Sequence, residues 1–216
     1  MPRDRKAKQL RARRRTREAL DQARAVLGAR GAAPAEGATA ALLAQLQEDA
    51  ELLGRAGALR ISAARRLQGA QSRVRTRTAA LFSLCSDVRR RVRDACRGRR
   101  NAAVRAAFGE GACPGGGKVP EVLKLAEQIL SAAPAHPAEL QAARVTPRLL
   151  AGLLARREAL RQAIADRRAW RDHQEQLAAR LAAAASRVLL ACTALGPPPA
   201  PTTPAPPSPT AAESAP

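Results

Sequence analysis

Aromatic residues are almost absent from this chain of 216 residues. It has no tyrosine, and its only aromatic residues other than histidine are Phe82, Phe108 and Trp170. Many nucleic-acid-binding modules stack bases on aromatic side chains, so this scarcity argues against RRM and OB-type modules. The sequence also carries no zinc-finger, homeodomain or RRM signature. Any binding of nucleic acid is therefore expected to tolerate different base sequences.

Histidine and paired cysteines are scarce as well. His136 and His173 are the two histidines, and neither stands at metal-ligand spacing from cysteines or carboxylates. Cys85 and Cys96 lie about 16 Å apart along a helix, too far for a disulfide. We expect no cofactor, no metal, and buried thiols in a reducing, cytoplasmic setting. The less favoured alternative is a redox or metal role for Cys113. The four cysteines are Cys85, Cys96, Cys113 and Cys192.

Long apolar runs are missing from the sequence. No stretch approaches the eighteen or so uninterrupted apolar residues of a membrane-spanning helix. The basic N-terminus is followed by no apolar segment of the kind that signal peptides have. Both observations favour the cytoplasm.

Acidic residues are too few to balance the basic ones. Thirty-eight Lys and Arg face eighteen Asp and Glu, which gives a formal charge of +20. Such an excess indicates attraction to nucleic acid or anionic lipid rather than a particular fold. Residues 3–17 hold nine basic residues and one acid. They predict a basic arm over 1–37, helical from about 10 to 28 and followed by a linker.

Alanine, leucine and arginine dominate what is present, and they favour helices over strands. The predicted fold is all-α, an antiparallel helical bundle over 38–195 with long helices. A disordered, proline-rich tail is expected over 196–216. Apolar residues recur every seven positions from Val74, in two rows. The rows are Val74, Leu81, Val88, Ala95 and Ala102, and Thr78, Cys85, Val92, Arg99 and Ala106.

Glycine and proline predict where these helices end. A helix is expected to stop at Phe108–Gly109, a short one to open at Pro120, and the last to run from Thr146–Pro147 to about Leu190, with Gly196 beyond it. One of Gly54, Gly57 and Gly69 is expected to mark a kink or a reversal, and the sequence does not say which.

Two segments resemble catalytic or binding motifs only in part. Residues 112–119 nearly spell a phosphate-binding P-loop, but Val119 stands where the motif needs Ser or Thr. Asp166, Trp170 and His173 share a helix face, yet no nucleophile accompanies them. We expect a solvated helix laced with salt bridges there. The sequence thus predicts a protein that is not an enzyme and has no small-molecule substrate.

The basic clusters are the candidate site. Residues 60–105 carry fourteen arginines against two acids, on a helix face away from the Val88 and Val92 seam. Side chains at this spacing suit a phosphate backbone. Ion pairs within the helix are expected for Asp87–Arg91 and Asp94–Arg97. The candidate phosphate contacts are Arg11, Arg13, Arg14, Arg15, Arg17, Arg89, Arg90, Arg93, Arg97 and Arg100.

Several functions fit this pattern. The first is non-specific binding of DNA or RNA. The second is a structural or interaction bundle that associates with itself or with a partner helix. Attachment of residues 10–27 to an anionic membrane is a less favoured third. If the last helix packs antiparallel, the predicted register places Glu158 near Arg99, and Asp87 near Arg167 or Arg171.

Overall fold

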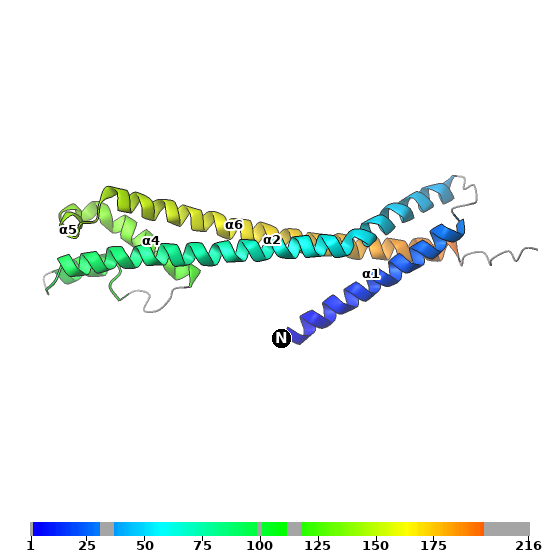
Figure 1. Cartoon of the computed structure of the whole chain (residues 1–216), viewed down its shortest axis with the longest axis horizontal. Helices are drawn as coiled ribbons and strands as arrows, with labels where there is room; N and C mark the ends of the chain where they lie inside the picture. The colour runs from blue at the N-terminus through cyan, green and yellow to red at the C-terminus, as the bar shows by residue number, and fades with distance from the viewer. Residues whose placement is uncertain (1, 31–36, 99–100, 112–117, 197–216) are drawn as a thin grey trace, which may run out of the picture. The chain divides into compact units, whose positions relative to one another are not determined.

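Every regular element is a helix in the residues that the computed structural model describes, 2–30, 37–98, 101–111 and 118–196. This confirms the predicted all-α class. The P-loop-like glycines and the proline-rich tail lie outside these ranges. The elements, shown in Figure 1, are α1 (Pro2–Arg30), α2 (Ala38–Ala95), α3 (Ala102–Ala107), α4 (Val119–Ala132), the 3-10 turn η2 (Ala133–Ala135), α5 (Pro137–Ala142) and α6 (Pro147–Leu195).

The chain forms two compact units. Unit 1 comprises 1–59 and 177–216, and unit 2 comprises 60–176. Helices α2 and α6 each contribute one part to each unit.

Unit 1 packs small side chains between three helices. Its core takes residues from α1, α2 and α6, namely Ala19, Ala23, Val26, Leu46, Ala50, Leu53, Ala56, Leu181, Ala184, Ala185, Val188 and Leu195. The many alanines let the helix backbones approach closely. Helix α1 begins at Pro2 instead of near residue 10, and it passes Gly28 to end at Arg30. The Arg30 guanidinium donates to the Leu195 carbonyl, which ties the end of α1 to that of α6.

Unit 2 is built around α2 and α6, with α4 against them. The predicted rows at Val74, Leu81 and Val88, and at Cys85 and Val92, are buried. Arg156 donates to the Ala80 carbonyl at 3.1 Å, and Arg77 donates to the Ala159 carbonyl. Residue numbers therefore rise along α2 as they fall along α6, so the two helices are antiparallel in this unit.

The predicted continuation of α2 to Phe108 is wrong. Helix α2 ends at Ala95, and Gly98 follows with φ +115°, a conformation that side chains other than glycine rarely adopt. Arg105 of α3 donates to the carbonyls of Cys96 and Gly98, at 2.8 and 2.7 Å. These bonds satisfy carbonyls that the end of the helix would leave without partners.

Of the other residues predicted to mark helix boundaries, some do so in the structure and others lie within a helix. Gly54, Gly57 and Gly69 lie inside α2 without ending it, so this segment is one helix. The Thr146 hydroxyl accepts from the Leu149 amide at 3.3 Å and begins α6 as predicted. Glycines with positive φ follow Phe108 and Leu195, which confirms the predicted ends at Gly109 and Gly196.

Candidate polyanion interface

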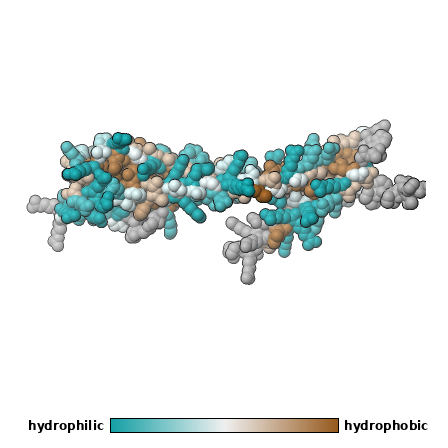
Figure 2. All heavy atoms as spheres, in the orientation of Figure 1, coloured by the Kyte–Doolittle hydropathy of each residue, from teal (hydrophilic) through white to brown (hydrophobic). Residues whose placement is uncertain are grey.

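The first group of predicted contacts lies on α1. The five side chains Arg11, Arg13, Arg14, Arg15 and Arg17 are all exposed. The buried face of α1 begins at Thr16 and continues at Ala19, and Arg17 does not belong to it. In the part of the chain that the structure describes, only Arg14 of these five has a carboxylate partner, Glu18 at 2.8 Å. Figure 2 shows hydrophilic side chains over the described part of this helix.

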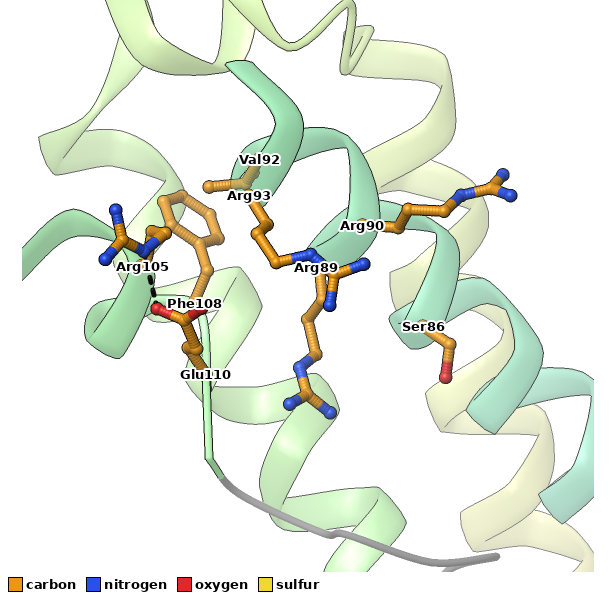
Figure 3. A pocket seen from close by; sticks show the side chains of 8 residues that line it. All are labelled: Ser86, Arg89, Arg90, Val92, Arg93, Arg105, Phe108 and Glu110. Carbon is orange, nitrogen blue, oxygen red and sulfur yellow. Dashed lines mark hydrogen bonds and ion pairs between the residues drawn. The ribbon is translucent and has the colours of Figure 1, made fainter. Parts of the chain in front are cut away.

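The second group lies near the end of α2, in unit 2. Three of its predicted members, Arg89, Arg90 and Arg93, line one pocket of about 320 Å³ (Figure 3). Arg97 lies outside the lining, is 81% exposed and pairs with Asp94 at 3.5 Å. Arg100 is not among the described residues. The structure therefore brings together three of the five, and the two groups belong to different units.

Two of the pocket's arginines form ion pairs with nearby acids. Arg90 donates to Asp87 at 2.7 Å, and Arg105 donates to Glu110 at 2.6 Å. Hydrogen bonds from Arg90 and then Arg91 lower the pKa of Asp87, so this carboxylate stays charged well into the acidic range. The predicted pairs Asp87–Arg91 and Asp94–Arg97 are both confirmed, at 2.8 and 3.5 Å.

Sequence reasoning missed one whole wall of the pocket. Ser86 and Val92 come from α2, but Arg105, Phe108 and Glu110 come from α3 and the residues after it. On a continuous helix, Arg105 would stand about 18 Å beyond Arg93 along the axis. The turn near Gly98 brings it back beside the end of α2. Gly98 was the only signal of this turn in the sequence.

The other motif-like residues have structural roles. The Arg66 guanidinium carbon stands 4.8 Å from the centre of the Trp170 ring, and His173 packs edge-on at 5.5 Å. Arg171 lies 3.8 Å from Asp172 and 3.9 Å from Glu175, as expected for a solvated helix with salt bridges.

The histidines and cysteines do not gather into a site in the described residues. His136 packs against Phe108 with ring centroids 5.8 Å apart. No group of three His, Cys, Asp or Glu residues that could hold a metal ion occurs in the described ranges. Cys85 and Cys96 are buried as predicted, and partial burial raises the pKa of Cys192. Cys113 lies outside the described residues.

Helix α6 is long and apolar enough to cross a membrane by length and composition alone. An 18-residue window in it has a mean hydropathy of 1.4, and 28% of that window is buried. Charged residues interrupt α6, so this window does not contradict the prediction that no uninterrupted apolar run of this length exists. Core helices of water-soluble bundles pass the same test, so it is weak evidence for a membrane span.

Comparison with known proteins adds no relative. No family model, no curated protein and no solved structure matches this chain.

Proposed function

We propose that this chain is a non-enzymatic helical protein that binds the phosphate backbone of DNA or RNA, chiefly through α1. One observation carries the proposal. Five arginines within residues 11–17 are exposed, and four of them have no carboxylate partner in the described part of the chain. Unpaired, hydrated cations on a rigid element need little rearrangement to meet phosphates.

The geometry of α1 suits a backbone rather than base edges. Residues 11–17 span about 9 Å of helix axis, and their arginines point around most of the helix circumference. Each phosphate contact releases condensed counterions, which supplies affinity without reading sequence. Phe82, Phe108 and Trp170 all lie in unit 2, so unit 1, to which α1 belongs, contains no Phe, Tyr or Trp ring on which bases could stack. The expected binding is salt-sensitive and tolerant of sequence.

The test compares two variants that lose the same charge. The arm variant replaces Arg11, Arg13, Arg15 and Arg17 by Gln. The surface control replaces the exposed Arg65, Arg75, Arg168 and Arg180 by Gln. Arginine and glutamine have similar helix propensities, so both variants should keep their helices. Circular dichroism checks this before any binding is measured.

Fluorescence anisotropy with unrelated DNA and RNA duplexes, at about 50 to 200 mM salt, then gives the salt dependence of affinity. For the wild type, the logarithm of the binding constant should fall steeply with the logarithm of the salt concentration. The magnitude of this slope should be smaller by about 3 to 4 in the arm variant if each replaced arginine meets one phosphate. The surface control should keep most of the slope. Absence of binding at the lowest salt, or equal losses in both variants, would overturn the assignment to α1.

A structural or interaction bundle is the competing function, and it has an observation of its own. Leu10 and Leu190 in unit 1 are 65% and 71% exposed. Sedimentation at about 500 mM salt, where surface charges are screened, tests it. This alternative would be favoured over nucleic-acid binding if the wild type forms a concentration-dependent oligomer and the substitutions Leu10→Gln and Leu190→Gln make it dissociate.

A further inference from the structure

We propose that the pocket at the end of α2 binds a phosphate monoester in its doubly charged form. This site goes beyond the duplex binding assigned to α1, and it depends on different residues in the other unit. The lining residues are Ser86, Arg89, Arg90, Val92, Arg93, Arg105, Phe108 and Glu110. The volume of about 320 Å³ lies at the lower end of small-ligand sites. It holds a phosphate with a small attached group and excludes a duplex.

The acids among the described residues leave the pocket with at least two uncompensated positive charges. Asp87 accepts from both Arg90 and Arg91, and Glu110 accepts from Arg105. Arg89 and Arg93 have no carboxylate partner within the described residues. They stand four positions apart on α2, and two like charges at this spacing weaken a helix unless an anion lies between them. Figure 3 shows both side chains on the pocket side of the helix.

The end of α2 does not itself require Arg93. Cations in the last turn of a helix often serve its free carbonyls. Here Arg105 already donates to Cys96 and Gly98. Arg93 is therefore available to a ligand, together with Arg89 and the hydroxyl of Ser86, which stands one turn before Arg89 on the same face.

The opposite wall is fixed, which favours a defined ligand position. Arg105 makes three hydrogen bonds of 2.6 to 2.8 Å, and its side chain is 20% exposed. Phe108 and Val92 beneath it are 1% exposed. Buried apolar groups keep water away from one side of the site, so the attraction between guanidinium and phosphate is stronger there than in bulk water.

The charge count selects the ligand class. A phosphate monoester carries about −1.5 to −2 at neutral pH, which matches Arg89 and Arg93, the two lining arginines without a carboxylate partner in the described residues, and each guanidinium fork can bond two phosphate oxygens. A diester carries a single charge and would leave one arginine unmatched. The monoester could be a free small molecule or the terminal phosphate of a nucleic-acid strand, and the experiment separates these sources.

Isothermal titration of the full chain with inorganic phosphate, phenyl phosphate and dimethyl phosphate tests the site. Inorganic phosphate and phenyl phosphate, which can both carry two negative charges, should bind with dissociation constants of about a millimolar or tighter. Dimethyl phosphate, a diester, should bind at least about tenfold more weakly. The pocket variant, Arg89→Gln with Arg93→Gln, should lose binding. The control, Arg75→Gln on α2 with Arg97→Gln just after α2, changes two arginines outside the lining and should retain binding.

A second pair of substitutions guards against misfolding. Arg89→Lys with Arg93→Lys keeps the charge and removes the forks, so monoester binding should weaken but persist. No monoester binding by the wild type would overturn the proposal. Equal binding of the diester, or equal losses in the pocket variant and its control, would do the same, because each indicates a diffuse charge effect.

The source of the phosphate is assigned with the arm variant, in which binding of nucleic acid by α1 does not obscure binding at the pocket. A 5′-phosphorylated tetranucleotide that binds more tightly than its 5′-hydroxyl form, and only with Arg89 and Arg93 present, assigns a strand terminus. Equal affinity of the two, with phenyl phosphate still bound, assigns a free small molecule. The arm variant should leave phenyl phosphate binding unchanged, so failure of the pocket and failure of α1 give different results.

Discussion

Asp49 is an acidic side chain that unit 1 buries almost completely. Its carboxylate accepts two hydrogen bonds from Arg187, at 2.8 and 2.6 Å, which joins α2 to α6 within this unit. The side chain of Asp49 is 5% exposed, and that of Arg187 is 51% exposed. The bonds to Asp49 raise the pKa of Arg187, so the guanidinium is charged at any ordinary pH. If the ion pair is broken, water can therefore hydrate the exposed Arg187 guanidinium but not the buried Asp49 carboxylate.

This asymmetry predicts unequal costs for the two halves of the pair. Arg187→Met leaves a buried carboxylate without its cation, which should cost about 2 to 3 kcal/mol of unfolding free energy. Asp49→Asn leaves an arginine that water reaches, so its cost should be about 1 kcal/mol. Urea denaturation of both variants and the wild type measures the difference. Equal costs, or a larger loss for Asp49→Asn, would contradict this account of the pair.

Single residues also mark what the sequence could reveal of the site. Arg89, Arg90 and Arg93 were predicted together because their spacing places them on neighbouring positions of one helix turn. Arg105 and Phe108 were not, since their approach depends on the end of α2 and not on local spacing. Asp49 and Arg187 lie 138 positions apart. Nothing in the local pattern around either residue pointed to the other.

At the scale of elements, helix boundaries that depend on local signals were easier to predict than the register between helices. Thr146–Pro147 and Gly196 act through bonds and backbone angles within a few residues. The predicted register extended α2 to residue 107 and so placed Asp87 opposite Arg167 or Arg171. Helix α2 ends twelve residues earlier, and Ala80 lies opposite Arg156. Asp87 consequently pairs along its own helix, and Glu158 pairs with Arg157 and Arg161.

The end of α2 is therefore the element-scale feature to test, and two glycines form a matched pair. A Cβ atom added at Gly98 or at Gly54 would meet nothing within 4 Å, so packing is equal at both. Gly98 has φ +115°, whereas Gly54 lies inside the helix. Gly98→Ala should cost about 1 to 2 kcal/mol through backbone strain. Gly54→Ala should stabilise by about 0.5 to 1 kcal/mol.

Thermal unfolding followed by circular dichroism measures both glycine variants. A stabilising Gly98→Ala would mean that α2 can continue past Ala95, as the seven-residue rows first suggested. Binding of phenyl phosphate by Gly98→Ala adds a second readout, since the turn at Gly98 brings Arg105 and Glu110 to the pocket. A folded variant with a displaced α3 should bind this probe less tightly than the wild type.

At the scale of the whole molecule, the charge of +20 acts on folding and on binding with opposite signs. Like charges repel in the compact state, so the excess lowers stability. Raising NaCl from about 20 to 200 mM shortens the screening length from roughly 20 Å to 7 Å and relieves this repulsion. The melting temperature should rise by a few degrees over this range, which corresponds to about 1 kcal/mol or more for a chain of this size. The same salt should weaken duplex binding.

The arm variant separates these two effects of salt. Its charge falls from +20 to +16, because four arginines become glutamines. Its melting temperature should therefore depend less on salt, and it should lie above that of the wild type at low salt. Affinity for duplexes should fall at the same time. A melting temperature that is flat or falls with salt in the wild type would show that the ion pairs of the described helices, such as Asp49–Arg187 and Asp87–Arg91, outweigh the net repulsion.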